Sequence, residues 1–129
     1  MKKTLTIILT DGPYISEYAE IAYKIARAAQ KDHEVNIFLY LDAVHIPKHG
    51  QMPLLFRNAG ESFEKLANCG ATVRACVRCA AARGYLPDKD LSDERSSVCQ
   101  DYHKGIEITS LYDLAEMLKR SDRVIALSR

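Results

Sequence analysis

Two apolar segments near the start of the chain flank a segment with helical spacing. Residues 4–10 and residues 35–41 are rich in β-branched and other apolar side chains, and both have the length of a buried strand. Between them, apolar side chains recur every three or four positions: Tyr14, Tyr18, Ile21, Ala22, Ile25, Ala28 and Ala29. This spacing predicts one helix of about 20 residues. A strand, a helix and a strand make a βαβ unit, which implies a parallel sheet.

The pattern after residue 41 predicts a long loop and then a second helix. Residues 42–57 contain two prolines and a glycine among polar side chains, and loops of this length are usually functional or face a partner. Asn58 is suited to cap a helix that carries Phe63 and Leu66, and Gly70 ends it.

A third strand is predicted over residues 71–75, and Cys76 follows it directly. The next segment is alanine-rich and helical, and Gly84 stops it. Residues 87–104 are polar and charged with little periodicity, so they are expected to form a surface loop.

The last part of the chain predicts a fourth strand over residues 106–109 and a final strand over residues 123–127. Ser110 and Asp113 match a capping box at the start of the helix between them. That helix is expected to turn four apolar side chains inward: Leu111, Leu114, Ala115 and Leu118.

Together these elements predict a small doubly wound α/β domain with three layers. It has about five mainly parallel strands with helices on both faces. No composition shift or linker divides the chain, so residues 1–129 are expected to form a single domain.

Composition narrows the functional classes. The chain carries 18 basic and 17 acidic side chains, a net charge of +1, which gives no support for direct nucleic-acid binding. No apolar run approaches the roughly 20 residues needed to cross a bilayer, and no membrane partner is expected. The start of the chain lacks a signal-peptide pattern, which predicts a cytoplasmic protein. In a reducing compartment the four cysteines are expected to be free thiols, metal ligands or catalytic groups.

Candidate chemistry gathers where strands end, because open parallel sheets bind ligands at the carboxyl edge. Cys76 lies at a strand end and opens a helix, where unpaired N–H groups and the helix dipole favour a thiolate. Arg78 would add positive potential and contact a substrate. Asp11, Gly12 and His45 follow two other strands and are candidate binding residues. Simpler interpretations exist for these residues. Cys76 could be a buried apolar cysteine, Asp11 and Gly12 could form a turn with a helix cap, and His45 could be a solvated loop histidine.

The spacing of Cys76 and Cys79 leaves several chemistries open. Cys79 could resolve an oxidised Cys76, act with it as a redox pair, or simply pack in the core. A zinc site needs two more ligands, and the sequence has no second close pair of cysteines or histidines. No metal and no organic cofactor is therefore predicted, and no phosphate-binding glycine motif is present.

Three blocks of the sequence together resemble the DsrE/DsrF-like proteins, closest to the TusD/DsrE branch. The first is Thr10-Asp11-Gly12-Pro13-Tyr14 with the helix after it, and the second is the block from Ala75 to Gly84 that Cys76 and Cys79 open. The third is the segment from Ser110 to Val124 with its Asp-Arg-Val ending. The blocks occur in the family's order over nearly the whole chain.

The resemblance implies a sulfur-relay protein that needs no cofactor. In this branch the cysteine that heads the block accepts a persulfide sulfur and passes it to a partner's cysteine, a role that falls on Cys76. Partners would be sulfur-donor and sulfur-acceptor proteins, and family members assemble as trimers or hexamers. Some members serve tRNA thiolation and others sulfur oxidation. Cys79 stands where the branch usually has alanine, and Asp11 is inserted in its turn, so a dithiol variant stays open.

Overall fold

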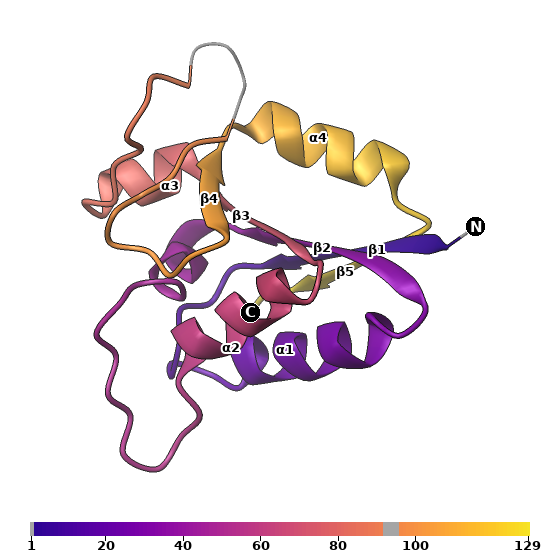
Figure 1. The fold of residues 1–129 in the computed structure, drawn as a ribbon, viewed down its shortest axis with the longest axis horizontal. Coiled ribbons are helices and arrows are strands. Elements are labelled where there is room, and N and C mark those ends of the chain that lie inside the picture. Colours follow the sequence, from indigo (N-terminus) through magenta and orange to yellow (C-terminus); the bar gives the residue numbers. More distant parts are fainter. Residues whose placement is uncertain (1, 92–95) are drawn as a thin grey trace.

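A five-stranded sheet forms the centre of the computed structural model, which describes residues 2–91 and 96–129 (Figure 1). The strands are β1 (Lys3–Leu9), β2 (His33–Leu39), β3 (Thr72–Cys76), β4 (Ile106–Thr109) and β5 (Arg123–Leu127). Their order across the sheet is β4-β3-β2-β1-β5, and every neighbouring pair is parallel. The predicted three-layer α/β fold is therefore confirmed.

The helices lie on both sides of this sheet and at its carboxyl edge. They are α1 (Tyr18–Ala29), α2 (Ala59–Asn68), α3 (Val77–Ala82), α4 (Leu111–Arg120) and the 3₁₀ helix η1 (Leu41–His45). Figure 1 shows α1 and α2 below the sheet and α4 above it, with α3 at the left-hand end. Within the described residues, no helix has the length and apolar character needed to cross a membrane.

The two faces of the sheet differ in chemistry. One row of paired positions across four strands is fully or almost fully buried and apolar: Ile7, Ile37, Val73 and Ile106. Because side chains alternate along a strand, the neighbouring row of Thr6, Asn36 and Thr72 points to the opposite face. Asn36 and Thr72 line a cavity together with residues of α4, so the polar row faces α4 and the apolar row faces α1 and α2.

The first helix is shorter than predicted. It begins at Tyr18, whereas Tyr14 lies before it with a φ of 71°. The Tyr14 hydroxyl accepts a hydrogen bond from the Ala59 N–H at the start of α2, at 3.0 Å, and this contact holds Tyr14 outside the helix. The buried stripe of α1 is accordingly shifted from the predicted one and consists of Ala19, Ala22, Tyr23 and Ala26.

The inward face of α4 was predicted only in part, since Leu114 packs against the core as predicted but Ala115 is exposed. Leu111 and Leu118 are exposed, and Met117 is the buried residue of this helix. The reason is the polar face of the sheet beneath it. Asp113, Met117 and Arg120, at helical spacing, are the α4 residues that line the polar cavity there. The apolar stripe of α4 therefore points largely to solvent.

Two predicted helix caps had different outcomes. The Asn58 side chain accepts a hydrogen bond from the Glu61 N–H at 3.0 Å, as predicted. Ser110 stands at the N-cap of α4, but its hydroxyl makes no cap bond and is buried without a partner among the residues that the structure describes. The predicted capping box is therefore absent.

The two long loops are partly ordered against each other. The predicted loop over residues 42–57 begins within η1, and its Lys48 forms an antiparallel bridge with Tyr102 of the second loop. Ser97 bridges Ile108 of β4. Of the predicted surface loop over residues 87–104, residues 92–95 lie outside the described residues.

The two caps give a matched test of these contacts. Replacing Asn58 by Ala removes a formed cap, and we expect it to lower the free energy of unfolding by about 1 kcal/mol. Ser110→Ala removes an unpaired buried hydroxyl, so we expect a change close to zero or a small stabilisation. Urea unfolding of both variants measures the two effects, and equal losses at both positions would contradict the assignment.

Candidate functional site

Cys76 joins a strand to a helix with no residue between them. It is the last residue of β3 and the N-cap of α3, with extended backbone angles of −64° and 126°. Its side chain makes no cap hydrogen bond, and the residue is 0% exposed. The predicted position at the carboxyl edge of the sheet is thus observed, but the thiol is covered rather than open to solvent.

Cys79 lies one helical turn further along and is also buried. Burial raises the pKa of its thiol; a backbone hydrogen bond from Leu41 opposes the rise, and the neighbouring Cys76 thiol adds to it. The first turn of α3 therefore carries two adjacent thiols. Leu41, which opens η1, has a φ of 53°, a strained value for a residue with a side chain.

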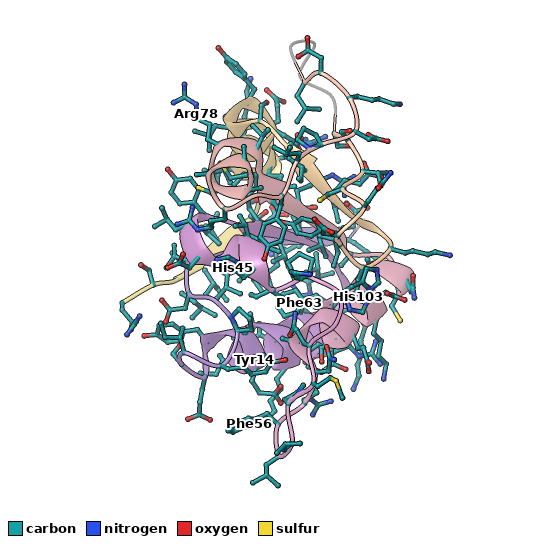
Figure 2. All side chains as sticks on the ribbon, turned by 90° about the vertical axis from the view of Figure 1, so that its left-hand side faces the viewer. Tyr14, His45, Phe56, Phe63, Arg78 and His103 are labelled. Carbon is teal, nitrogen blue, oxygen red and sulfur yellow. The ribbon has the colours of Figure 1, made fainter. Side chains whose placement is uncertain are left out.

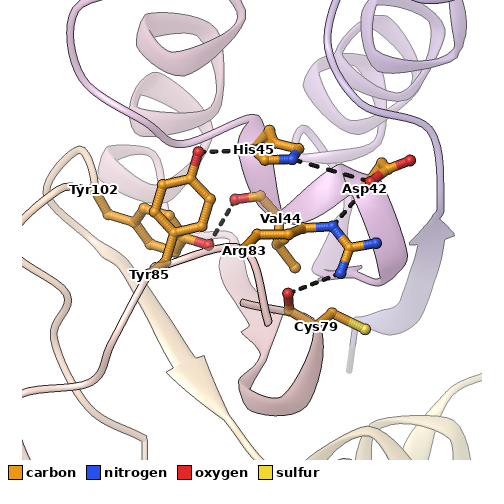
Figure 3. Close-up of polar contacts among 7 residues, drawn as sticks. All are labelled: Asp42, Val44, His45, Cys79, Arg83, Tyr85 and Tyr102. Carbon is orange, nitrogen blue, oxygen red and sulfur yellow. Dashed lines mark hydrogen bonds and ion pairs between the residues drawn. The ribbon is translucent and has the colours of Figure 1, made fainter. Parts of the chain in front are cut away.

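A polar network connects η1 to the end of α3 (Figure 3). Arg83 places its Nε 2.9 Å from the Asp42 carboxylate and donates a second hydrogen bond to the Cys79 carbonyl, also at 2.9 Å. Nε2 of His45 lies 4.0 Å from the same carboxylate oxygen, and Nδ1 of His45 lies 2.7 Å from the Tyr85 hydroxyl. The network fixes η1 against the end of α3, where the Leu41 N–H reaches the Cys79 thiol.

Two tyrosines extend this network into the protein interior. The Tyr102 hydroxyl donates to the Val44 carbonyl at 2.6 Å, and the rings of Tyr85 and Tyr102 lie 5.2 Å apart. Burial raises the pKa of both tyrosines, so both stay protonated at neutral pH. Sequence reasoning missed these residues, because nothing local to positions 85 and 102 indicates that they meet η1.

The structure brings some predicted binding residues together and separates another. A side chain at Gly12 would place its Cβ 3.1 Å from the Asp42 carbonyl oxygen, so the Gly12 turn packs against the start of η1. Asp11 is buried, accepts a hydrogen bond from Ser16 and pairs with Arg129 at 3.1 Å. Its carboxylate therefore has structural partners, but it is not a helix cap, because Glu17 is the N-cap of α1. His45 belongs to the network above.

Arg78 lies apart from the other predicted binding residues. Figure 2 shows it pointing away from His45 at the top of the view. It lines a groove of about 510 Å³ between α3 and α4, together with Val77, Ser110, Leu111, Tyr112 and Ala115. This groove begins at the residue after Cys76, so a partner seated in it would contact the first turn of α3.

The remaining cysteines and histidines do not surround Cys76. Cys69 is exposed at the end of α2, and Cys99 is buried, which raises its pKa. His103 bonds Glu64 at 2.7 Å and its ring lies 4.2 Å from that of His49. Within the described residues, no three His, Cys, Asp or Glu side chains are grouped so as to hold a metal ion.

Two features define the class of protein: the fold, a parallel sheet covered by helices, and a thiol at the junction of a strand and a helix. The model of the DsrE/DsrF-like family matches residues 3–127. The chain belongs to the DsrE/DsrF-like family. This confirms the resemblance that the three sequence blocks indicated.

The sequences of two relatives match almost the whole chain. An uncharacterized protein of Methanopyrus kandleri is 36% identical over 94% of this chain and 91% of its own length. An uncharacterized protein of Methanocaldococcus jannaschii is 33% identical over 93% of this chain and 96% of its own. The crystal structure of the ychN protein from E. coli has the same fold, with a TM-score of 0.77 at 24% identity, covering 98% of this chain and 100% of that one.

The interior hydrogen bond of Tyr102 can be tested separately from any reaction. Tyr102→Phe leaves the Val44 carbonyl without its partner, and we expect a loss of about 1–2 kcal/mol in the free energy of unfolding. Tyr112→Phe is the matched control, because Tyr112 is 67% exposed and should change stability by less than about 0.5 kcal/mol. Denaturant unfolding of both variants measures this, and a neutral Tyr102→Phe variant would show that the bond is unimportant.

Proposed function

We propose that the chain is a sulfur-relay protein that accepts a sulfane sulfur as a persulfide on Cys76 and passes it to a cysteine of a partner protein. The observation that carries this proposal is the position of Cys76 at the β3–α3 junction, at the carboxyl edge of the sheet. Membership of the DsrE/DsrF-like family supports the same role.

The reaction needs only thiol chemistry. The Cys76 thiolate attacks the outer sulfur of a donor persulfide, which forms the Cys76 persulfide and releases the donor thiolate. A partner thiolate then attacks the outer sulfur of the Cys76 persulfide, takes it, and leaves Cys76 as a thiolate. Each step makes one S–S bond and breaks one, so no metal, organic cofactor, oxidant or reductant is consumed.

Transfer requires the covering of Cys76 to open, because the residue is 0% exposed. The element suited to move is η1, since it is only five residues long and begins at the strained Leu41. Its polar anchors to the end of α3 and the residues after it lie near the surface: Arg83 pairs with Asp42, and the Tyr85 hydroxyl bonds His45. A docking donor that displaced η1 would expose the thiols only while it was bound.

Cys79 supports a second, dithiol function at the same site. Its thiolate can attack the inner sulfur of the Cys76 persulfide, forming a Cys76–Cys79 disulfide and releasing hydrosulfide. The raised pKa of Cys79 slows this step near neutral pH, which protects the persulfide for transfer. Regeneration of the dithiol would then need an external thiol reductant.

The partners we propose are donor and acceptor proteins together with further copies of this chain. Four large apolar side chains stand exposed on the loop before α2: Met52, Leu54, Leu55 and Phe56. Exposed apolar groups in this number are typical of protein–protein contacts, and a homotrimer or hexamer would cover them. The balanced net charge of +1 favours protein partners over direct contact with nucleic acid. The cytoplasm, a reducing compartment, would keep the thiols free.

Sulfur loading tests the role of Cys76. After incubation with a sulfane-sulfur donor, we expect the wild-type chain to gain about 32 Da per loaded site, on the peptide that contains Cys76. Cys76→Ser should abolish the gain, and Cys69→Ser should keep it, because Cys69 is exposed and lies on another helix end. Equal loading of the Cys76→Ser variant on the same helix would refute the assignment. No loading at all would favour a non-catalytic partner-binding subunit.

The pH dependence of persulfide lifetime tests Cys79. Because the pKa of Cys79 is raised, its thiolate fraction grows only as the pH rises above neutral. We expect the wild-type Cys76 persulfide to decay faster at about pH 9.5 than at about pH 7, with release of hydrosulfide and formation of a disulfide. Mass spectrometry follows both products. Cys79→Ser should remove the disulfide and flatten the pH dependence; an unchanged profile would show that Cys79 only packs.

A further inference from the structure

A small polar cavity lies between α4 and the polar face of the sheet. Its volume is about 170 Å³. Its polar lining comes from three strands, from α4 and from the segment before β4: Asn36, Thr72, Arg74, Ser96, Thr109, Asp113 and Arg120. Cavities for cofactors and drug-sized ligands have about 300–1,000 Å³, so this one suits a smaller ligand. A water molecule takes about 30 Å³ in the liquid, and a small inorganic ion with some water would fit.

Thr109 indicates that the cavity is built to bind something polar. The residue lines the cavity and is 1% exposed, and its buried hydroxyl has no hydrogen-bond partner among the described residues. A buried unpaired hydroxyl is unfavourable, and valine would fill the same position on β4 without that disadvantage. A ligand that accepts a hydrogen bond would satisfy it.

Two arginines give the cavity its charge. Arg74 is half-buried and donates a hydrogen bond only to the carbonyl of its own neighbour Val73, at 3.0 Å. Among the described residues, neither Arg74 nor Arg120 has a carboxylate within 4.0 Å. Glu107 is paired with Arg74 across the strands, but its carboxylate bonds Ser96.

The Asp113 carboxylate on α4 also lines the cavity, and the Glu107 carboxylate lies next to it, bonded to the lining residue Ser96. Two guanidinium groups against one carboxylate leave the lining positive. Guanidinium forks match the oxygen edges of tetrahedral anions. Arg74 is half-buried, so solvent screens its contacts less than those of the exposed Arg120.

We propose that this cavity binds a small tetrahedral oxyanion such as sulfate, thiosulfate or phosphate. Arg74 and Arg120 supply the charge, and the Thr109 hydroxyl donates to an anion oxygen. The proposal does not rest on the proposed sulfur relay. Thr109 is nevertheless paired with Cys76 in the sheet. An anion bound to Thr109 would therefore lie near the strand end that carries the cysteine.

Isothermal titration of the wild-type chain with sulfate, thiosulfate and phosphate, at constant ionic strength in a weakly coordinating buffer, tests the proposal. We expect saturable binding of at least one anion with one site per chain. The relative affinities of the three anions identify whether a sulfur oxyanion or phosphate is the better ligand. Absence of saturable binding by all three would overturn the proposal.

Three variants locate the site. Arg74→Met should weaken binding by at least about tenfold, as expected for loss of a charge-assisted bond. Thr109→Val should weaken binding several-fold while the anion-free melting temperature stays the same or rises, since the hydroxyl is unpaired without a ligand. Asp113→Asn should tighten binding, because it removes the opposing charge.

Arg123→Met is the matched control. Arg123 also bonds only the carbonyl of its preceding residue, at 3.1 Å, but it is exposed on β5 and does not line the cavity. Its loss should leave anion affinity unchanged. If Arg123→Met weakened binding as much as Arg74→Met, the binding would be diffuse surface attraction and the proposed site would be wrong. If Arg74→Met fails to fold, Thr109→Val and Asp113→Asn still decide the question by their opposite effects.

Discussion

The direct junction of β3 and α3 at Cys76 is the constraint on which the rest of the site depends. Cys76 pairs with Thr109 in the sheet and at the same time occupies the N-cap position of α3, so no loop separates the strand from the helix. The helix must therefore start at the carboxyl edge, and its first turn returns Cys79 to the side of Cys76. Its last residues deliver Arg83 to Asp42 on η1. The strand end thus fixes the thiol pair and its covering together.

That covering is held by contacts between segments distant in sequence. Asp42 and His45 come from η1, Arg83 and Tyr85 follow α3, and Tyr102 lies in the second long loop. The contacts are polar near the surface and buried at Tyr102, where the hydroxyl anchors the Val44 carbonyl. Movement of η1 would break the outer contacts first. The same contacts therefore keep the thiol covered and hold η1, the element that can move.

Sequence patterns predicted what depends on local chemistry. The five strands, the Asn58 cap and the place of Cys76 follow from β-branched runs, a cap residue and a strand that stops at a cysteine. What failed depends on tertiary contacts. Tyr14 is drawn from α1 by a bond to α2, and α4 turns Met117 rather than Leu118 inward because the sheet beneath is polar. The tyrosine network could not be predicted, since its members lie up to 58 residues from their partners.

The polar face of the sheet links the anion cavity to assembly. A helix that must cover Asn36, Thr72 and Arg74 turns Asp113 and Arg120 toward them. The apolar stripe that the same helix carries then faces outward, with Leu111, Tyr112 and Leu118 exposed. An apolar helix face is costly to leave in water, and the groove between α3 and α4 continues it to within one residue of Cys76. The same polar strands that create a charged cavity inside therefore create an apolar contact surface outside, next to the thiol that we propose meets its partners.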